Sequence, residues 1–446
     1  MIEKYYSGVI EQIYNRIGKE TRNIVMANYS NDFSIENLEV IRRYQSNEDN
    51  VFFAYSEFSY NTLVGAYEPF LDIICNMHRR FIGGSFDDFQ KECGVYYLHR
   101  QVLNSYYETG ECFREETVLL NEVAYEQRRM TMAIADMLKK LSEVKPLMIV
   151  INRFQMASKS SIETIKYLID NPCANIGIVL GVNAIVKGTD STVEVWDRIV
   201  ESLEDRSAIY YIGSAGPLKN NIKTTNDDEL YITMNFEQSI QEASNIMEFL
   251  DYEQARRGCR IIEHKIKFEN AWIDEKSLRR FYLVYARTSV LLGEMSKAIE
   301  LMNEYKALIP ENDSEHYLSL YYFMKGTCYM YQGKLEKAEG CAKKAYDYAL
   351  LADDELLEFK SELLSVMIKM SGWYNIFFCV QDIPVSDEII EKLIKHGYRN
   401  HLAHIYIYAY DNSRDVVKQS FYDESLLKHF TKGLELAKEI GNEQLV

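Results

Sequence analysis

The 446-residue chain contains only 6 prolines, against 34 tyrosines and a hydrophobic content of 47%. So few prolines favour long, uninterrupted helices over a loop-rich architecture. No apolar run approaches the roughly 18 residues that a membrane span needs, and the first residues lack the basic-then-apolar pattern of a secretory signal. We therefore expect a cytoplasmic protein that does not enter a membrane and is long enough for two or three domains.

The sequence also lacks the spacings that typify metal and disulfide sites. None of its eight cysteines forms a Cys-x-x-Cys pair, which excludes a disulfide framework and a zinc knuckle. The one histidine cluster comprises His396, His401 and His404, and its three-residue spacing could place two rings on one helix face. Because no nearby cysteine completes a ligand set, we expect no metal site there.

Basic residues are outnumbered. The chain has 50 Lys and Arg residues against 67 Asp and Glu, a formal net charge of −17. Such a charge repels a phosphate backbone, so direct nucleic-acid binding is not expected, whereas a basic protein partner is allowed. Gly-x-Ser-x-Gly, His-Glu-x-x-His and Cys–His catalytic patterns are also missing, and we expect no enzymatic activity.

The strongest local pattern lies in residues 146–168. Residues 147–151 form a continuous apolar run bounded by a proline and a polar pair, which is typical of a central parallel strand buried on both faces. Ser160 and Ser161 can cap a following helix with apolar residues at helical spacing. Four other runs, 22–27, 51–55, 176–182 and 208–212, have the character of strands and alternate with helical patterns. The sequence thus predicts an α/β parallel-sheet domain.

Residues 147–168 resemble the Walker B region of STAND-type relatives of AAA+ ATPases, found in large bacterial signalling and transcriptional regulators. The matching residues after the strand are Phe154, Gln155, Ala157, Ser161 and the Tyr167-Leu168 pair. Tyr67-x-Pro69-Phe70, after the second strand, resembles another segment of this family. The resemblance implies a P-loop-like domain with strand order 5-1-4-3-2. It also places Asn183 at the sensor-1 position, although an asparagine at a strand end is more often a turn residue.

The chain departs from the family at both parts of the phosphate machinery. Asn152 and Arg153 stand where the family has two acids, one for the Mg²⁺ shell and one for the attacking water. An amide is a poor ligand for a hard cation, and a guanidinium repels it. Residues 28–35, where the resemblance places the phosphate loop, contain neither glycine nor lysine. Gly18-Lys19 precedes the strand and lacks the required context. We expect a degenerate ATPase fold without cofactor.

A second region begins near residue 236, where the pattern changes to helix pairs. Two copies of a tetratricopeptide (TPR) repeat are recognisable, around Ala286 and Ala298 and around Gly326 and Ala338, with weaker copies near Ala255 and at 426–433. Small residues at these positions are typical of closely crossing helices. We therefore predict a degenerate α/β domain at 1–218, a polar linker at 219–235 and an all-α TPR-like solenoid at 236–446.

The concave face of such repeats is the predicted partner site. The TPR pattern places arginines together with apolar and aromatic side chains on this face, which suits an extended peptide carrying a carboxylate. The alternative is that the next helix of the solenoid covers these positions. The candidate partner-binding residues are Arg280, Arg287, Phe323, Met330 and Tyr331.

Three hypotheses about function follow from these patterns. The first is a non-catalytic regulatory or scaffold protein, a pseudo-ATPase whose TPR groove binds a protein or peptide. The second is a nucleotide-dependent switch with an atypical phosphate loop. The third is the sensory N-terminal part of a longer transcriptional regulator or diguanylate-cyclase-type signalling protein. Self-association into a homo-oligomer is left open by all three.

Overall fold

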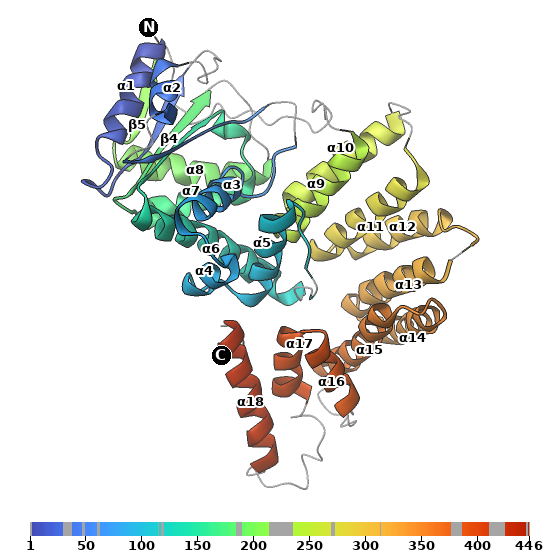
Figure 1. Cartoon of the computed structure of the whole chain (residues 1–446). Coiled ribbons are helices and arrows are strands. Elements are labelled where there is room, and N and C mark those ends of the chain that lie inside the picture. Colours follow the sequence, from blue (N-terminus) through green and yellow to red (C-terminus); the bar gives the residue numbers. More distant parts are fainter. Residues whose placement is uncertain are drawn as a thin grey trace. The chain divides into compact units, whose positions relative to one another are not determined.

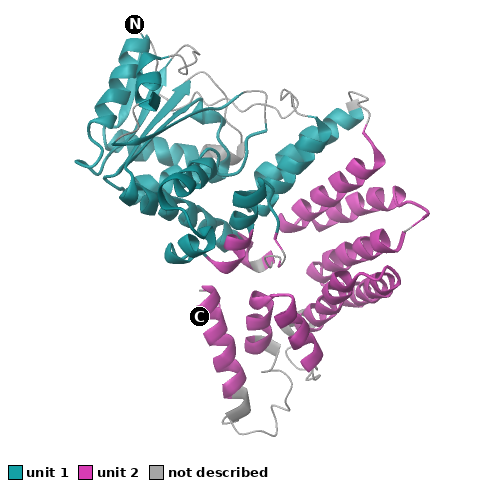
Figure 2. Cartoon of the chain, in the orientation of Figure 1, with its two compact units in different colours: residues 1–95, 102–113, 124–271 teal, residues 96–101, 114–123, 272–446 magenta. Residues whose placement is uncertain are grey.

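The computed structural model describes residues 2–29, 38–46, 50–59, 63–114, 116, 120–183, 190–213, 235–268, 273–312, 314–375, 386–409, 424–442 and 445. It divides into two compact units, which Figure 2 shows in different colours. Unit 1 comprises residues 1–95, 102–113 and 124–271, and unit 2 comprises residues 96–101, 114–123 and 272–446. Each is described by itself below. No helix in the described part of the chain is both long and apolar enough to cross a bilayer.

Unit 1 contains a five-stranded parallel sheet with the order β2-β3-β4-β1-β5. This order is the predicted 5-1-4-3-2 arrangement, so the α/β fold class is confirmed. The six residues of β3 and the eight of β4 are all buried, as expected for central strands with both faces covered. The strands are β1 (Ile24–Tyr29), β2 (Phe52–Glu57), β3 (Leu147–Asn152), β4 (Ile176–Asn183) and β5 (Ile209–Ile212).

Helices lie on both faces of this sheet (Figure 1). α1 and α2 pack on one face, where Tyr6, Ile10 and Ile13 of α1 join Val150 and Val179 in a single apolar core. The other helical elements that begin before residue 235 lie between the strands along the chain, and of these η2 and the first turn of α5 belong to unit 2. The bounds of all these elements are α1 (Ile2–Tyr14), α2 (Glu39–Ser46), α3 (Phe70–Met77), η1 (His78–Ile82), α4 (Phe86–Glu92), α5 (Tyr97–Thr109), η2 (Leu120–Glu122), α6 (Val123–Val144), η3 (Phe154–Met156), α7 (Lys159–Asp170) and α8 (Asp190–Asp205).

The cap of α7 differs from the expected one. α7 begins at Lys159, earlier than predicted, because Ser158 has an extended backbone and its side chain accepts a hydrogen bond from the Ser161 amide. Ser158 is therefore the N-cap, and Ser160 and Ser161 are buried residues of the first turn. The hydroxyl of Ser161 instead donates to the carbonyl of Glu68 at 2.8 Å, which ties α7 to the segment of the Tyr67-x-Pro69-Phe70 match.

The helix pair α9 (Phe236–Glu248) and α10 (Tyr252–Phe268) belongs to unit 1. Asp251, buried before α10, accepts hydrogen bonds from the Gln254 amide at 3.4 Å and from the Ser160 amide at 3.1 Å, so one carboxylate serves the first turns of two helices. Lys159 and Glu253 add an ion pair at 2.9 Å. The last stretch of unit 1 ends at residue 271. Residues 219–234 of the predicted linker lie outside the described part, so the linker stays a prediction.

Unit 2 consists chiefly of antiparallel helix pairs, which confirms the predicted helical solenoid. Gly293 and Gly333, both at positive φ, form the turns within the two clear repeats. A Cβ on Gly326 would lie only 3.2 Å from the Cβ of Cys341, so the small residue there permits a close helix crossing. The helices are α11 (Glu275–Leu291), α12 (Met295–Ala307), α13 (Ser314–Tyr331), α14 (Leu335–Leu351), α15 (Glu355–Asn375), α16 (Asp387–Lys395), α17 (Arg399–His404), η5 (Ile405–Ala409) and α18 (Glu424–Ile440).

Candidate functional site

The carboxyl ends of the parallel strands in unit 1 form the candidate site, because ligands of open α/β sheets bind beyond these ends. The register pairs Tyr29 with Asn183 across β1 and β4, and Glu57 with Asn152 across β2 and β3. Asn152, and Arg153 directly after it, are therefore at the carboxyl edge of the sheet, where the sequence pattern predicted them. Residues 30–37, which include most of the segment without glycine and lysine, lie outside the described part of the chain.

Asn152 is fully buried and closed off by tyrosines. The hydroxyl of Tyr29 donates a hydrogen bond to Asn152 Oδ1 at 2.5 Å. The ring of Tyr6, from α1, meets the ring of Tyr29 edge to face with centroids 6.3 Å apart. Burial raises the pKa of Tyr6 well above its usual value, with smaller contributions from Tyr29, Tyr55 and Glu57. The Tyr29 phenol thus donates to Asn152 in a buried environment, and burial keeps the Tyr6 phenol beside it protonated.

Gly181 makes room for this arrangement. A Cβ placed on Gly181 would lie 2.5 Å from the hydroxyl oxygen of Tyr6 and 2.8 Å from Asn152 Oδ1. Separations below 3.0 Å are not tolerated by a real side chain, so Tyr6 and Asn152 occupy the volume that a larger residue in β4 would need. β4 therefore carries a glycine because of the packing of α1 against the sheet.

Arg153 adopts a left-handed backbone conformation, with φ at 54°, directly after β3. Its guanidinium forms an ion pair with Glu57 at 3.0 Å, and both side chains are largely buried. The other oxygen of Glu57 accepts a hydrogen bond from the hydroxyl of Tyr55. The carboxylate at this edge is consequently engaged by a cation and a phenol of the chain itself.

These residues do not fit a Mg²⁺–nucleotide complex. A divalent cation needs carboxylate or water oxygens around it, whereas Asn152 offers an amide already bonded to Tyr29, and Glu57 is neutralised by Arg153. Asn183 is buried at the end of β4, and its backbone amide donates to Gln155 Oε1 at 3.3 Å. Gly18-Lys19 lies next to Ala174, to whose carbonyl the Gly18 amide donates, at the opposite edge of the sheet.

Sequence reasoning found Asn152 and Arg153 but missed Tyr6, Tyr29 and Glu57. Glu57 could have been found, because the implied order places β2 beside β3 and counting along the strands then puts Glu57 opposite Asn152. Tyr6 could not, since nothing in its helix pattern shows that its hydroxyl reaches the end of a strand.

In unit 2 the candidate groove residues differ in how far they are buried. Arg280 is exposed, and Arg287 is half-buried. Met330 belongs to an apolar core with Leu364 and Ile368 of α15, and Phe323 packs against the same core. The expectation that Met330 lines an open groove is therefore corrected: α15 covers it.

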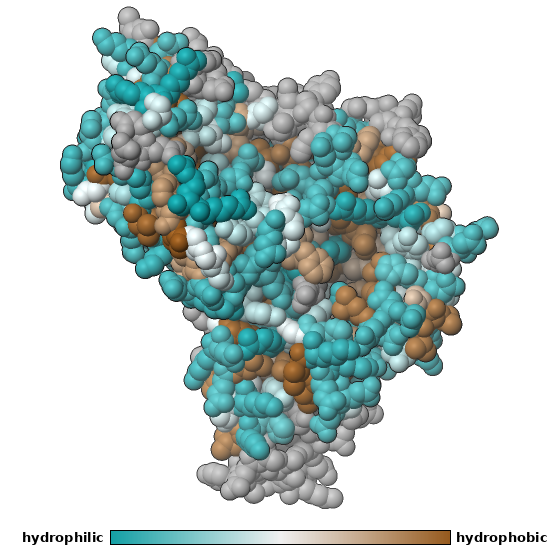
Figure 3. Space-filling view, viewed as in Figure 1, coloured by the Kyte–Doolittle hydropathy of each residue, from teal (hydrophilic) through white to brown (hydrophobic). Residues whose placement is uncertain are grey.

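Tyr331, the last candidate, is exposed at the end of α13. Its hydroxyl accepts a hydrogen bond from the Leu120 amide at 3.3 Å, so it is fixed by the 114–123 segment. Figure 3 shows a mainly hydrophilic face with small, separate hydrophobic patches, as the acidic composition would produce. Arg280 is the candidate best placed to meet a partner.

The histidine cluster is divided between different partners. His401 Nδ1 lies 2.6 Å from Glu116 Oε1, and His404 Nε2 lies 2.9 Å from Glu122 Oε1. His396 instead stacks on the ring of Phe359. Among the described residues no group of three His, Cys, Asp or Glu side chains could hold a metal ion. His401 and His404 thus each pair with one carboxylate in unit 2.

No family model matches this chain, and no curated protein matches it. Among solved structures, it is similar to a Signal Transduction ATPase with Numerous Domains (STAND) protein with a tetratricopeptide repeat sensor from Pyrococcus horikoshii. The alignment covers 98% of this chain and 77% of that chain, with 12% sequence identity and a TM-score of 0.40.

Proposed function

We propose that this chain is a non-catalytic regulatory or scaffold protein, in which a pseudo-ATPase domain is joined to a TPR-like region that binds a protein or peptide. The observation that carries the proposal is the Tyr29–Asn152 hydrogen bond beside the Arg153–Glu57 ion pair. In these two contacts the side chains of Asn152, Arg153 and Glu57 are bonded to other residues of the chain. Such contacts stabilise the fold at this edge, which is what a scaffold requires, and they do not favour binding of a reacting phosphate.

The binding half of the proposal relies on Arg280 and Arg287. Both lie on α11, seven residues apart, so they project from similar directions on the helix two turns apart. Arg280 is exposed and Arg287 is half-buried. A guanidinium orients a carboxylate through two parallel hydrogen bonds, and we therefore expect an acidic or carboxylate-bearing peptide segment as the ligand.

Nucleotide titration of the full chain tests the first half. A ligand at 100 times its Kd would add about 2.7 kcal/mol to the free energy of unfolding, a change that thermal denaturation detects. We expect ATP and ADP, with or without Mg²⁺, to leave the melting temperature unchanged and no Mg²⁺-dependent hydrolysis to occur. A Mg²⁺-dependent ATPase rate that persists through purification and is lost in Asn152→Ala would overturn the proposal and favour the nucleotide switch.

A peptide array tests the second half. Binding of acidic peptides to the full chain should fall at least tenfold in Arg280→Glu, because the substitution turns an attraction into a repulsion. Lys337→Glu, a matched charge reversal at an exposed position of α14, is the control. If both variants bind like the unmodified chain, α11 does not carry the partner site.

A further inference from the structure

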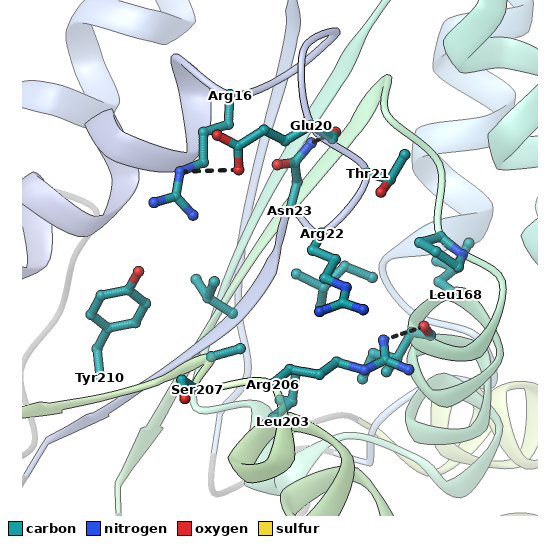
Figure 4. A pocket seen from close by; sticks show the side chains of 15 residues that line it. Arg16, Glu20, Thr21, Arg22, Asn23, Leu168, Leu203, Arg206, Ser207 and Tyr210 are labelled. Atoms are coloured by element: carbon teal, nitrogen blue, oxygen red, sulfur yellow. Dashed lines mark hydrogen bonds and ion pairs between the residues drawn. The ribbon is translucent and has the colours of Figure 1, made fainter.

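A pocket of about 220 Å³ lies at the amino-terminal edge of the sheet in unit 1. It is lined by the residues that precede β1 and β5 and by the ends of α7 and α8, as Figure 4 shows. This is the edge opposite to Asn152 and Arg153. The pocket is therefore a different site from the degenerate nucleotide position, and it is independent of the proposed function.

The charged lining of this pocket is basic. Three arginines line it, Arg16, Arg22 and Arg206, together with one glutamate, Glu20. In a chain with a formal net charge of −17, such a cluster is a local reversal of sign. A concave site with positive charge raises the local concentration of anions.

The three arginines differ in the contacts that they already make within the chain. Arg16 forms an ion pair with Glu20 at 3.6 Å. Arg206 donates to the carbonyl of Ile169 at 2.6 Å, near the C-terminus of α7, which leaves its other N–H groups available. Arg22 is exposed, and within the described ranges it has no ion pair or hydrogen bond. Figure 4 shows the guanidinium groups of Arg22 and Arg206 directed toward the same side of the pocket.

A buried acceptor lies in the same lining. Asn23 is fully buried, and its amide nitrogen donates to the carbonyls of Glu20 at 2.6 Å and Ala174 at 3.2 Å. Its Oδ1 accepts no hydrogen bond from the described residues. Since buried polar atoms are normally satisfied, this acceptor is an unfilled hydrogen-bonding position beside the pocket.

The remaining walls set the size and character of the ligand. Leu168, Leu203 and the ring of Tyr210 give the pocket apolar surface beside the arginines. Pockets that bind drug-sized molecules have volumes of about 300 Å³ or more, so this pocket is suited to a smaller ligand. A short aliphatic or polyol chain with one anionic group would place the anion on the guanidiniums and the chain against the apolar wall.

We propose that this pocket binds a small organic oxyanion, a phosphate monoester or a carboxylate, through Arg22 and Arg206. The rival explanation is that the arginines only neutralise the negative C-terminal ends of α7 and α8. Arg206 fulfils that role through Ile169. Arg22 does not, since no helix carbonyl accepts from it in the described part of the chain, and its substitution separates the two explanations.

The test uses the full chain with glycerol 3-phosphate, inorganic phosphate and butyrate as probes, against potassium chloride at matched ionic strength. At least one probe should bind by calorimetry and raise the melting temperature more than chloride does. Arg22→Gln should weaken this binding about tenfold or more while the fold remains intact, because hydrogen bonds to a charged group are lost. Arg206→Lys, which keeps a donor for Ile169, should weaken it less. Arg42→Gln, an exposed position on α2, is the control and should bind as the unmodified chain does.

The three probes also identify the source of the anion. Binding of glycerol 3-phosphate and phosphate without butyrate assigns the phosphate class, and the reverse assigns the carboxylate class. The proposal is overturned if no probe has an effect beyond that of chloride. It is equally overturned if Arg22→Gln binds as tightly as Arg42→Gln, because the arginines would then serve only the helix ends.

Discussion

His404 Nε2 lies 2.9 Å from Glu122 Oε1, although the two residues are 282 positions apart in the chain. Both side chains are buried in unit 2. Asn400 and Asn442 also donate to this carboxylate, at 3.3 and 3.4 Å. A few residues before α6 and the last helices of the chain thus share one buried polar network, in which each carboxylate oxygen of Glu122 accepts hydrogen bonds.

Unit 2 should therefore lose stability in acid. Burial disfavours the charged form of Glu122, but the hydrogen bonds and charge of His404, with those of Asn442 and Asn400, outweigh it and hold the pKa of the carboxyl below its usual value. A depressed pKa contributes stability that is present above the unfolded value, about 4.3 for Glu, and is lost as pH falls through the folded value. Denaturant unfolding of the full chain between pH 6 and pH 3 measures this loss.

Glu122→Gln should flatten that acid-side dependence and cost about 1.5–3 kcal/mol at neutral pH, because hydrogen bonds to a charged group are removed. Glu439→Gln is the matched control, since Glu439 pairs with Arg399 on the surface with 66% of its side chain exposed. Its cost should stay below about 1 kcal/mol. Equal effects of the two substitutions would show that the buried network adds nothing beyond a surface pair.

Glu242 in unit 1 should produce the opposite pH dependence. Burial, and then the charges of Glu68 and Asp72, raise the pKa of Glu242 to about 7. The folded chain then holds a proton that the unfolded chain has released, so stability falls as pH rises from about 4.3 to 7. Glu242→Gln should remove this slope and stabilise unit 1 at pH 8. A slope unchanged in the variant would assign it to another group.

Gly181→Ala should destabilise unit 1 by about 1–3 kcal/mol, the usual cost of overpacking a dense core. The added methyl would meet the Tyr6 hydroxyl and Asn152 at separations that require both to shift. Gly8→Ala makes the same chemical change inside α1, where nothing lies within 4 Å of the new Cβ. It should stabilise by about 0.5–1 kcal/mol through helix propensity. Urea unfolding of both variants provides the comparison, and a tolerated Gly181→Ala would refute the close packing at Asn152.

Phe323→Ala should lower the stability of unit 2 by about 1–3 kcal/mol, because the ring packs against the core that contains Met330 and Leu364. Arg280→Ala, at an exposed position, should change stability by no more than about 0.5 kcal/mol. Thermal denaturation of the two variants decides whether Phe323 is a core residue. If Phe323→Ala melts with the unmodified chain, the ring is free to serve a partner.

The parallel sheet could be predicted from the sequence because each strand is marked by residues that are adjacent in the chain. Continuous apolar runs such as 147–151 mark buried strands, and the family resemblance supplied the order in which they pair. The contacts that close the carboxyl edge were not predictable in this way, because the hydroxyl positions of Tyr6 and Tyr29 depend on how α1 lies on the sheet.

Long-range polar contacts account for the other differences. The positions of Glu116 and Glu122, before α6, give no sign that their partners are His401 and His404. Asp251 likewise has the appearance of an ordinary N-cap residue, and only the structure shows that it also serves the first turn of α7. Met330 fits the groove pattern of a TPR helix, but the packing of α15 buries it.

Unit 2 is built from separate segments of the chain, which limits how the protein can be divided into recombinant fragments. His401 and His404 take their carboxylate partners from residues 114–123, which precede most of unit 1 in the chain. A recombinant fragment that starts at residue 236 would contain every TPR-like helix but leave His401 and His404 without Glu116 and Glu122. Such a fragment should be prone to aggregation or partial folding. The properties of each unit are therefore better studied by substitutions in the intact chain.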